Sequence, residues 1–290
     1  MRSITSKSRP DSPFRSNLNQ MGRPHLASVC ALVALSLTGF GQQAVGTFSQ
    51  EYPTARVREE QQIIVDGLIE TWQLKWTSAP KPLCGADDFS SAITCPCQGF
   101  AYGEAGELFL SRLRDGVEID RLRLTPFFTD WRGEAVLQRW PFYDKDLKGY
   151  QRADFAVAVR KRTPVQVMHF GDYDHDGRSQ EFFLQTEALP CGKSAGIVVG
   201  LSQANPRLHV FGTASNPRKP LSMQKREWEA LRDASGPADV LDWACGDHGA
   251  DTETRLRLRW TAEGIMGIRR EYSCPADGKS QRRLVHQQAL

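Results

Sequence analysis

The chain has 290 residues, of which 40% are hydrophobic and 24% are charged. This balance excludes a disordered tail and a collagen-like fibre. No apolar run reaches the roughly 18 to 20 residues that a spanning helix needs, which excludes a multi-pass membrane protein. The formal net charge is +3, but much of this charge lies in a segment that we expect to be removed.

The N-terminus has the pattern of an export signal. Residues 1–25 carry five basic residues and one acid, and the apolar stretch 26–37 follows. A basic region, a short apolar region and small residues before a cleavage point are typical of a signal peptide. We therefore expect residues 1–46 to be removed, and a retained N-terminal membrane anchor is the alternative. Since Met21 lies just ahead of a compact signal, residues 1–20 can be an upstream extension.

Removal of the signal changes the charge of the protein. The remaining 47–290 hold 32 basic and 33 acidic residues, so nucleic-acid binding loses its compositional support. We expect a single domain, secreted or held in the periplasm or cell envelope, with no stable membrane span after cleavage.

Six cysteines remain after cleavage, and an even set in an oxidising compartment indicates disulfides. We expect the first three to close the region 84–97 and one of them to reach the later three. A zinc site that uses two of the thiolates with histidines is the competing interpretation, but the chain lacks the paired Cys-x-x-Cys units of a strong zinc motif. The six are Cys84, Cys95, Cys97, Cys191, Cys245 and Cys274.

The chain after residue 50 is predicted to be mainly β. Residues 53–66 form either a helix or a first strand. Further on, short segments rich in β-branched, aromatic and aliphatic residues lie between turn formers, which is typical of strands. The expected strands are 71–76, 108–113, 119–124, 135–140, 153–159, 165–170, 181–185, 196–201, 207–211, 254–260 and 265–272.

One helix is predicted near residues 222–234. Ser222 can cap it, Trp228 and Leu231 have helical spacing, and a Gly-Pro pair at 236–237 ends it. The polar C-terminal residues from about 281 are expected to fray.

Two of the expected strands alternate arginine with leucine. They are 121–124 and 255–260. This strict period of two is typical of a strand with one buried and one wet face, so we expect the arginines on a solvated face.

The strongest chemical signal is the segment 172–181 (DYDHDGRSQE), in which three carboxylates alternate and a glycine follows. Calcium takes six to eight oxygen ligands, and alternate side chains on a curved loop can converge on it. Neighbouring acids would repel one another without a cation. The segment therefore predicts a calcium site, and a solvated Asp-Gly hairpin is the alternative.

Residues 165–185 resemble the calcium loops of FG-GAP and VCBS-type repeats, which occur in β-propellers of integrin-like and bacterial exported proteins. The resemblance implies that Asp172, Asp174 and Asp176 take the first three ligand positions. It gives the backbone position to Arg178. The family usually places its last acid where this chain has Gln180, so either the amide oxygen of Gln180 or, through a bulge, Glu181 completes the site.

An enzymatic alternative uses Ser194, which lies in a Gly-x-Ser-x-Gly sequence, with His248. The nucleophile elbow of hydrolases needs a strand before the serine and a helix after it, whereas a strand is predicted after Ser194. Another version uses an acidic pair.

Aromatic residues offer a further alternative, because seven tryptophans could stack on sugar rings. Their apolar neighbours indicate core packing instead. They are Trp72, Trp76, Trp131, Trp140, Trp228, Trp243 and Trp260.

The sequence predicts a mainly β fold, as a degenerate β-propeller or an irregular β-sandwich. We expect an exported, disulfide-stabilised binding or interaction module with a structural calcium ion. Its partner would be a protein or a polysaccharide. A secreted hydrolase is the alternative.

Overall fold

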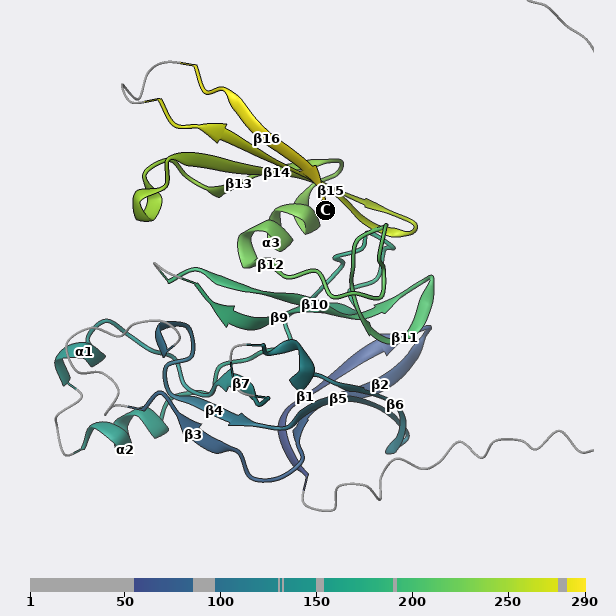
Figure 1. The fold of residues 1–290 in the computed structure, drawn as a ribbon. Helices are drawn as coiled ribbons and strands as arrows, with labels where there is room; N and C mark the ends of the chain where they lie inside the picture. The colour runs from purple at the N-terminus through teal and green to yellow at the C-terminus, as the bar shows by residue number, and fades with distance from the viewer. Residues whose placement is uncertain are drawn as a thin grey trace, which may run out of the picture. The chain divides into compact units, whose positions relative to one another are not determined.

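The computed structural model describes residues 55–85, 97–129, 131, 133–149, 154–189, 192–275 and 281–290, which belong to one compact unit. The predicted signal peptide lies outside the described residues. The strands form four antiparallel sheets, so the mainly β prediction is confirmed, and the irregular sandwich agrees with the arrangement in Figure 1.

The N-terminal sheet has the order β1-β2-β5-β6. The alternative of a first strand is confirmed, because residues 56–65 form β1. The strands β1 and β2 meet at Asp66-Gly67, where both residues have positive φ as two-residue hairpin turns require. The strands are β1 (Arg56–Val65), β2 (Leu68–Trp76), β5 (Leu108–Arg114) and β6 (Val117–Arg123).

A small sheet is interleaved with the N-terminal sheet in the chain, and two short helices come after both. The small sheet joins β3 (Lys81–Leu83), β4 (Gly103–Gly106) and β7 (Ala135–Gln138). The helices are α1 (Asp146–Gly149) and α2 (Phe155–Arg160), and single 3₁₀ turns lie at Cys97–Gly99 and Thr125–Phe127.

The central sheet has the order β11-β10-β9-β8, with β12 paired to β10. Nearly all of β10 is buried because both faces of this sheet are covered, so its apolar run does not alternate. The strands are β8 (Phe170–Gly171), β9 (Glu181–Ala188), β10 (Ser194–Ser202), β11 (Asn205–Val210) and β12 (Met223–Gln224).

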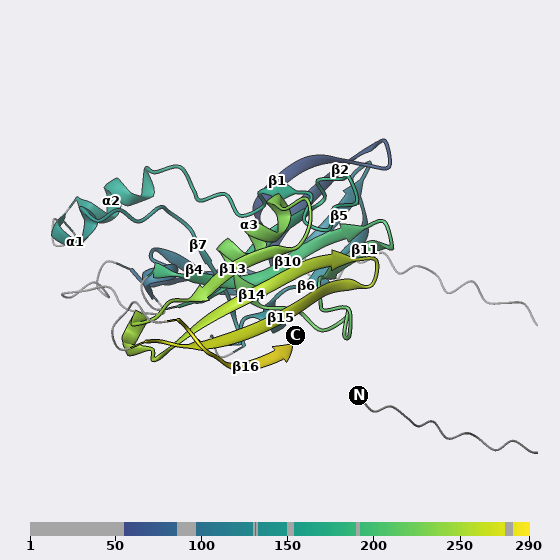
Figure 2. The ribbon, with the colours of Figure 1, turned by 90° about the horizontal axis from the view of Figure 1, so that it is seen from above.

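The C-terminal sheet has the order β13-β14-β15-β16. In Figure 2 these strands cross in front of α3, which lies between them and the central sheet in Figure 1. The elements are α3 (Lys225–Asp233), β13 (Ala238–Trp243), β14 (Thr252–Thr261), β15 (Gly264–Ser273) and β16 (Leu284–Ala289), with a 3₁₀ turn at Asp247–Gly249.

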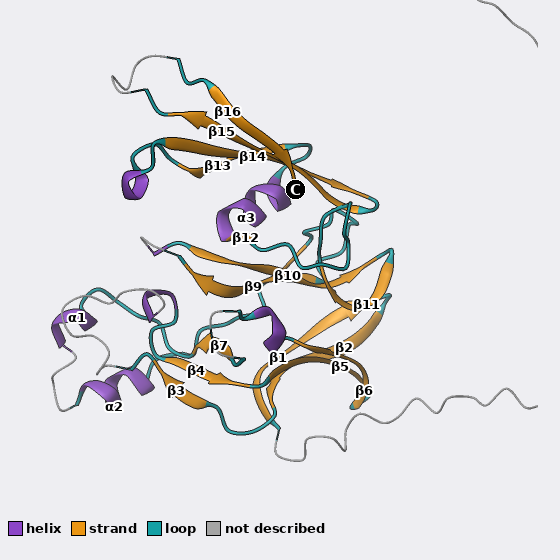
Figure 3. Cartoon of the chain, viewed as in Figure 1, coloured by secondary structure: helices purple, strands orange, loops and turns teal. Residues whose placement is uncertain are grey.

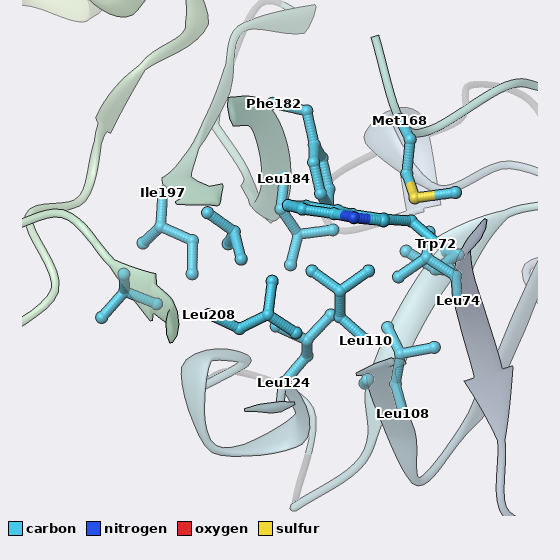
Figure 4. Close-up of a cluster of buried hydrophobic side chains, with 14 of the residues drawn as sticks. Trp72, Leu74, Leu108, Leu110, Leu124, Met168, Phe182, Leu184, Ile197 and Leu208 are labelled. Carbon is cyan, nitrogen blue, oxygen red and sulfur yellow. The ribbon is translucent and has the colours of Figure 1, made fainter. Parts of the chain in front are cut away.

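Two hydrophobic clusters join these layers. The first lies between the N-terminal and central sheets and is shown in Figure 4, where Trp72 lies against Phe182 and Leu184. The second joins the other side of the central sheet to α3 and the C-terminal sheet, around Trp228 and Leu231. Full burial of such side chains contributes roughly 1.5–3 kcal/mol each. This burial is the main stabilisation of α3.

The tryptophans are mainly core residues, as expected from their neighbours. Trp72, Trp76 and Trp228 are at most 2% exposed. The indole of Trp228 donates to the carbonyl of Gly196 at 3.0 Å, so its only polar atom is satisfied. These three rings are not available to stack on a sugar.

The predicted helix near 222–234 is confirmed, but it begins later than the sequence suggested. Gln224, not Ser222, is the N-cap, and Glu227 accepts a hydrogen bond from its backbone N–H at 2.8 Å in a capping box. Figure 3 shows α3 as the helix between the two sheets.

The strand predicted at 153–159 is wrong, because most of this segment forms α2. Phe155 and Val159 are four residues apart, and both are buried beside Tyr102. The i, i+4 spacing fits one face of a helix. The alternating valines suggested a strand because a short apolar run has no clear period.

The strand predicted at 165–170 is also mostly wrong, since only Phe170 enters a strand. The backbone N–H groups of Val167 and Met168 donate to the carboxylate of Glu59 at 2.6 and 3.0 Å. Side chains of β1 therefore satisfy this backbone in place of a neighbouring strand.

The C-terminal residues, which were expected to fray, instead contain β16. Its backbone pairs with β15 over Ile268 to Tyr272, although every side chain of β16 is exposed. The polar sequence does not indicate this strand, because β15 supplies it with backbone hydrogen bonds but does not bury its side chains. The prediction of fraying is therefore wrong for these residues.

Two disulfides are present among the described residues. Cys84 bonds Cys97 across a Cα–Cα distance of 5.3 Å, and Cys245 bonds Cys274 across 5.6 Å. The expected closure of the region 84–97 is confirmed, and Cys97 has no thiolate for zinc. Cys95 and Cys191 lie outside the described residues, so the expected link between the two groups stays a prediction.

Within the part of the chain that the structure describes, every helix is too short or too polar to span a bilayer.

Candidate functional site

The acidic loop of residues 172–180 connects β8 to β9. These two strands pair, with Gly171 opposite Glu181. Asp172 directly follows β8 and Glu181 begins β9, so the hairpin brings the two ends of the acidic segment together. The strand pairing thus explains why Glu181 lies beside the first aspartate.

Three carboxylates converge at this point. One oxygen each of Asp172, Asp174 and Glu181 lies within 4.8 Å of the others. The structure therefore places these three predicted residues together.

Glu181 is fully buried at 0% exposure. Its Oε2 accepts a hydrogen bond from the backbone N–H of Tyr173 at 2.8 Å. Its Oε1, like Oδ1 of Asp172, is buried without a hydrogen-bond partner among the described residues. Gly200 lies opposite Glu181 on β10, and a Cβ there would come within 3.0 Å of the Glu181 side chain. Close packing by β10 thus excludes water from this carboxylate.

The remaining oxygens hold the loop in a tight turn. Asp172 accepts the N–H of Gly177 at 3.0 Å, and Asp174 accepts the N–H of Asp176 at 3.1 Å. His175 and Gly177 both have positive φ, 60° and 87°. The glycine is needed here because other residues adopt this backbone conformation at a cost.

Asp176 differs from its neighbours because both of its oxygens accept backbone hydrogen bonds. Oδ1 accepts from Arg178 at 2.9 Å, and Oδ2 accepts from Gln203 in the β10–β11 turn at 2.8 Å. Asp176 lies outside the group of three converging carboxylates. Its observed contacts tie the loop to the central sheet.

The other predicted residues fasten the loop to neighbouring elements. The guanidinium of Arg178 pairs with Asp66 at 2.7 Å, and the amide of Gln180 donates to the carbonyl of Ile64 at 3.0 Å. His175 meets the carbonyl of Leu231 in α3 at 2.9 Å through Nε2. One loop is thus attached to the β1–β2 hairpin, the β10–β11 turn and α3.

Burial and mutual repulsion make it unfavourable for all three carboxylates to be ionised together. Burial raises the pKa of Glu181 to about 9, and the nearby aspartates push it in the same direction. Burial, followed by the charge of Asp176, raises the pKa of Asp174 to about 6. A cation at this point would remove the repulsion, and only oxygen donors converge here, which suits a hard cation such as calcium.

A cleft of about 910 Å³ adjoins the loop. Asp174 and Asp176 line one side of it, and Gln203 lies in the neighbouring turn. Phe211 and Trp260, whose ring centroids are 5.5 Å apart, contribute an aromatic wall. No local sequence pattern indicates this cleft, because its walls come from separate parts of the chain.

The hydrolase alternative gains no support from the local structure. Ser194 begins the strand β10, so no helix follows it as a nucleophile elbow requires. Asp247, the neighbour of His248, forms an ion pair with Lys193. The ammonium of Lys193 also lies 3.6 Å from the ring centroid of Trp243. These contacts fit a structural ion pair that packs on an aromatic ring.

An acidic pair is present elsewhere, at Glu227 and Asp242. Burial, then contact with Asp242, raises the pKa of Glu227 to about 8. Both residues contact Gln224 at the start of α3, where Glu227 belongs to the capping box. Capping accounts for this pair without a catalytic role.

The fold and the cysteine pairs define the chain as a disulfide-stabilised, mainly antiparallel β protein. Comparisons with protein-family models, characterised proteins and solved structures give no match to it.

Proposed function

We propose that the loop of residues 172–181 binds one calcium ion, which orders the loop in an exported binding module. The observation that carries the proposal is the state of Glu181. This carboxylate is fully buried, has one oxygen without a hydrogen-bond donor and lies beside Asp172 and Asp174. A buried charge with no cation is costly, and a bound ion would offset that cost.

Calcium fits the site better than zinc because the converging donors are carboxylate oxygens. Three carboxylates provide up to six oxygens, which is the lower end of calcium's range. The resemblance to FG-GAP and VCBS-type loops supports the same ion. The disulfides support an oxidising compartment, and export agrees with the N-terminal sequence pattern.

The role of the ion would be structural. The loop contacts the β1–β2 hairpin through Arg178, the β10–β11 turn through Asp176 and α3 through His175. Ordering the loop would fix one wall of the adjoining cleft. That cleft would be the binding surface for a protein or polysaccharide partner.

Calorimetric titration with calcium, together with thermal unfolding, tests the proposal. Extracellular calcium modules have dissociation constants on the order of 10⁻⁴–10⁻³ M. At about 10 mM calcium, such a site stabilises the fold by roughly 1.4–2.7 kcal/mol. Glu181→Gln should abolish both the binding heat and the stabilisation.

Glu187→Gln is the matched control, because Glu187 lies on the same strand and its carboxylate accepts a hydrogen bond from Ser222 at 3.2 Å, away from the acidic loop. It should bind calcium as the parent does. Equal calcium stabilisation of the parent and Glu181→Gln would refute the site, and so would an absence of any calcium heat in the parent.

A further inference from the structure

The outer face of the C-terminal sheet is rich in arginine. On β14, Leu256 and Leu258 are buried in the cluster around α3, so the alternate residues point away from it. Arg270 lies directly opposite Arg255 on β15. We define the arginine face as Arg255, Arg257, Arg259 and Arg270.

The charges of this face are incompletely balanced. Arg255 pairs with Glu253 at 2.7 Å, which also accepts Arg282 at 3.2 Å, and Arg257 reaches Asp239 at 3.7 Å. The ion pairs of this face therefore engage two carboxylates.

The two other members of the arginine face contact neutral groups. Arg270 donates to the amide oxygen of Gln287 at 2.9 Å, and Arg259 lies 3.7 Å from the sulfur of Met266. Like charges placed directly across a strand pair are destabilising, as Arg255 and Arg270 are here. The C-terminal sheet thus carries an excess of positive charge that does not stabilise the pairing of β14 with β15.

The strand β6 also carries alternate arginines, but there carboxylates balance their charge. On β6, Arg121 pairs with Glu118 at 2.7 Å, and Arg123 pairs with Glu107. The sequence alternation is the same as on β14, but each arginine pairs with a different carboxylate, and Glu118 also accepts Lys75 at 2.9 Å. The excess on β14 is therefore a property of that face and does not follow from the arginine–leucine pattern alone.

The arginine face also has a hollow suited to an anionic group. The charged and aromatic residues that line a depression of about 200 Å³ are Arg255, Arg257, Arg270, Asp239 and Tyr272. The side chains of Arg255 and Arg257 are each 50% exposed. Guanidinium groups bind oxyanions through two parallel hydrogen bonds, so this geometry favours sulfate or carboxylate groups.

We propose that the arginine face binds an extended acidic polysaccharide through its sulfate or carboxylate groups. Alternate residues of a strand lie about 6.8 Å apart, so the row on β14 offers a repeated cation to a repeated anion. The open sheet suits a chain better than a compact ligand. The two disulfides indicate an oxidising compartment, where acidic glycans are a more common polyanion than nucleic acid.

Binding of dextran sulfate, measured by calorimetry at several salt concentrations, tests this inference. The arginine face shares no residue with the calcium loop. The assay therefore contains a calcium chelator, so that its result does not depend on calcium binding. The parent should bind dextran sulfate and not neutral dextran. The variant Arg257→Gln with Arg270→Gln should bind about tenfold more weakly and show a salt slope reduced by about two, one for each lost contact.

The control removes the same charge from β6 by Arg121→Gln with Arg123→Gln, and it should bind within about twofold of the parent. An equal loss in both double variants would overturn the inference, because net charge alone would explain it. Stronger competition by single-stranded poly(dT) than by dextran sulfate, charge for charge, would also overturn it. If the β14–β15 variant unfolds, the single change Arg259→Gln removes one charge whose described partner is only Met266, and it should weaken binding about threefold; unchanged binding would count against the proposal.

Discussion

Among the residues that the structure describes, two glutamates are completely buried, and their surroundings are opposite. Glu70 on β2 and Glu181 on β9 are both 0% exposed. Arg112 grips Glu70 with two nitrogens, at 2.8 and 2.9 Å, and Arg114 adds a third contact at 2.7 Å. Glu181 instead lies among aspartates. The protein therefore contains both a neutralised buried carboxylate and one that lacks its counter-charge.

The difference appears in the pKa values. Burial alone would raise the pKa of Glu70, but the hydrogen bonds from Arg112 and Arg114 outweigh it and hold the pKa below the ordinary value. At Glu181 burial outweighs the hydrogen bond from the backbone N–H of Tyr173, the aspartates add to the effect of burial, and the pKa rises to about 9. The partners of a buried carboxylate thus indicate whether the chain itself supplies a positive charge to balance it.

The largest expected effect is at Glu70. Glu70→Gln leaves Arg112, with a side chain only 6% exposed, without its bidentate partner. Removing one member of a buried pair costs about 3 kcal/mol or more. Urea unfolding at pH 7 measures the loss. A change below about 1 kcal/mol would mean that Asp120, 3.6 Å from Arg112, already neutralises it.

The difference in unfolding free energy between the parent and Glu70→Gln should depend on pH. The folded pKa of Glu70 is lowered, so its contribution is fully present above the unfolded value of about 4.5 and is lost as the pH falls through the folded value. The stability gap between the parent and Glu70→Gln should therefore narrow between pH 5 and pH 3, roughly the range that acid titration of carboxylates covers. Unfolding curves in that range that keep a constant gap would show that Glu70 does not act through its charge.

When calcium is absent, the same substitution at Glu181 is not expected to lower the stability of the fold. Glu181→Gln in a chelator at pH 7 should be as stable as the parent or more stable by about 1 kcal/mol, because the parent must keep this carboxyl protonated to bury it, whereas the amide is neutral without taking up a proton. Thermal unfolding with and without chelator checks this. A chelated variant clearly less stable than the chelated parent would show that the chain already supplies the missing partner.

The smallest expected effect is at the surface contact that holds the acidic loop to the β1–β2 hairpin. Arg178→Gln breaks the pair with Asp66, whose side chains are 38% and 59% exposed. Exposed ion pairs contribute roughly 0–1 kcal/mol. The variant should unfold within about 0.5 kcal/mol of the parent and keep its calcium response. Loss of the calcium response would give Arg178 a role in ordering the loop.

The sequence could predict those features that depend on neighbours in the chain. Strand alternation on β14, the helix with Trp228 and Leu231 at its buried face, and the aspartate turn closed by Gly177 are local patterns. The closure of Cys84 with Cys97 also joins near neighbours, thirteen residues apart.

Other features depend on partners far along the chain and left no local signal. Glu59 takes the place of a strand partner for residues 167 and 168, more than a hundred positions away. Glu181 lies beside Asp172 because β9 pairs with β8 at Gly171, and the spacing of the acids does not encode this pairing. The neutralisation of Glu70 needs β5, and the cleft needs three separate segments.

The contacts between β1 and the segment 165–168 also bear on how the chain folds. Arg58, Glu59 and Gln61 reach the backbone of this segment across about 107 residues of intervening chain. Such long closures slow folding, since chain entropy is lost before the contact forms. The first strand therefore completes its hydrogen bonding late, after more than half of the chain has emerged. A fragment that ends before residue 165 would lack these contacts of β1 and should not reach the native arrangement.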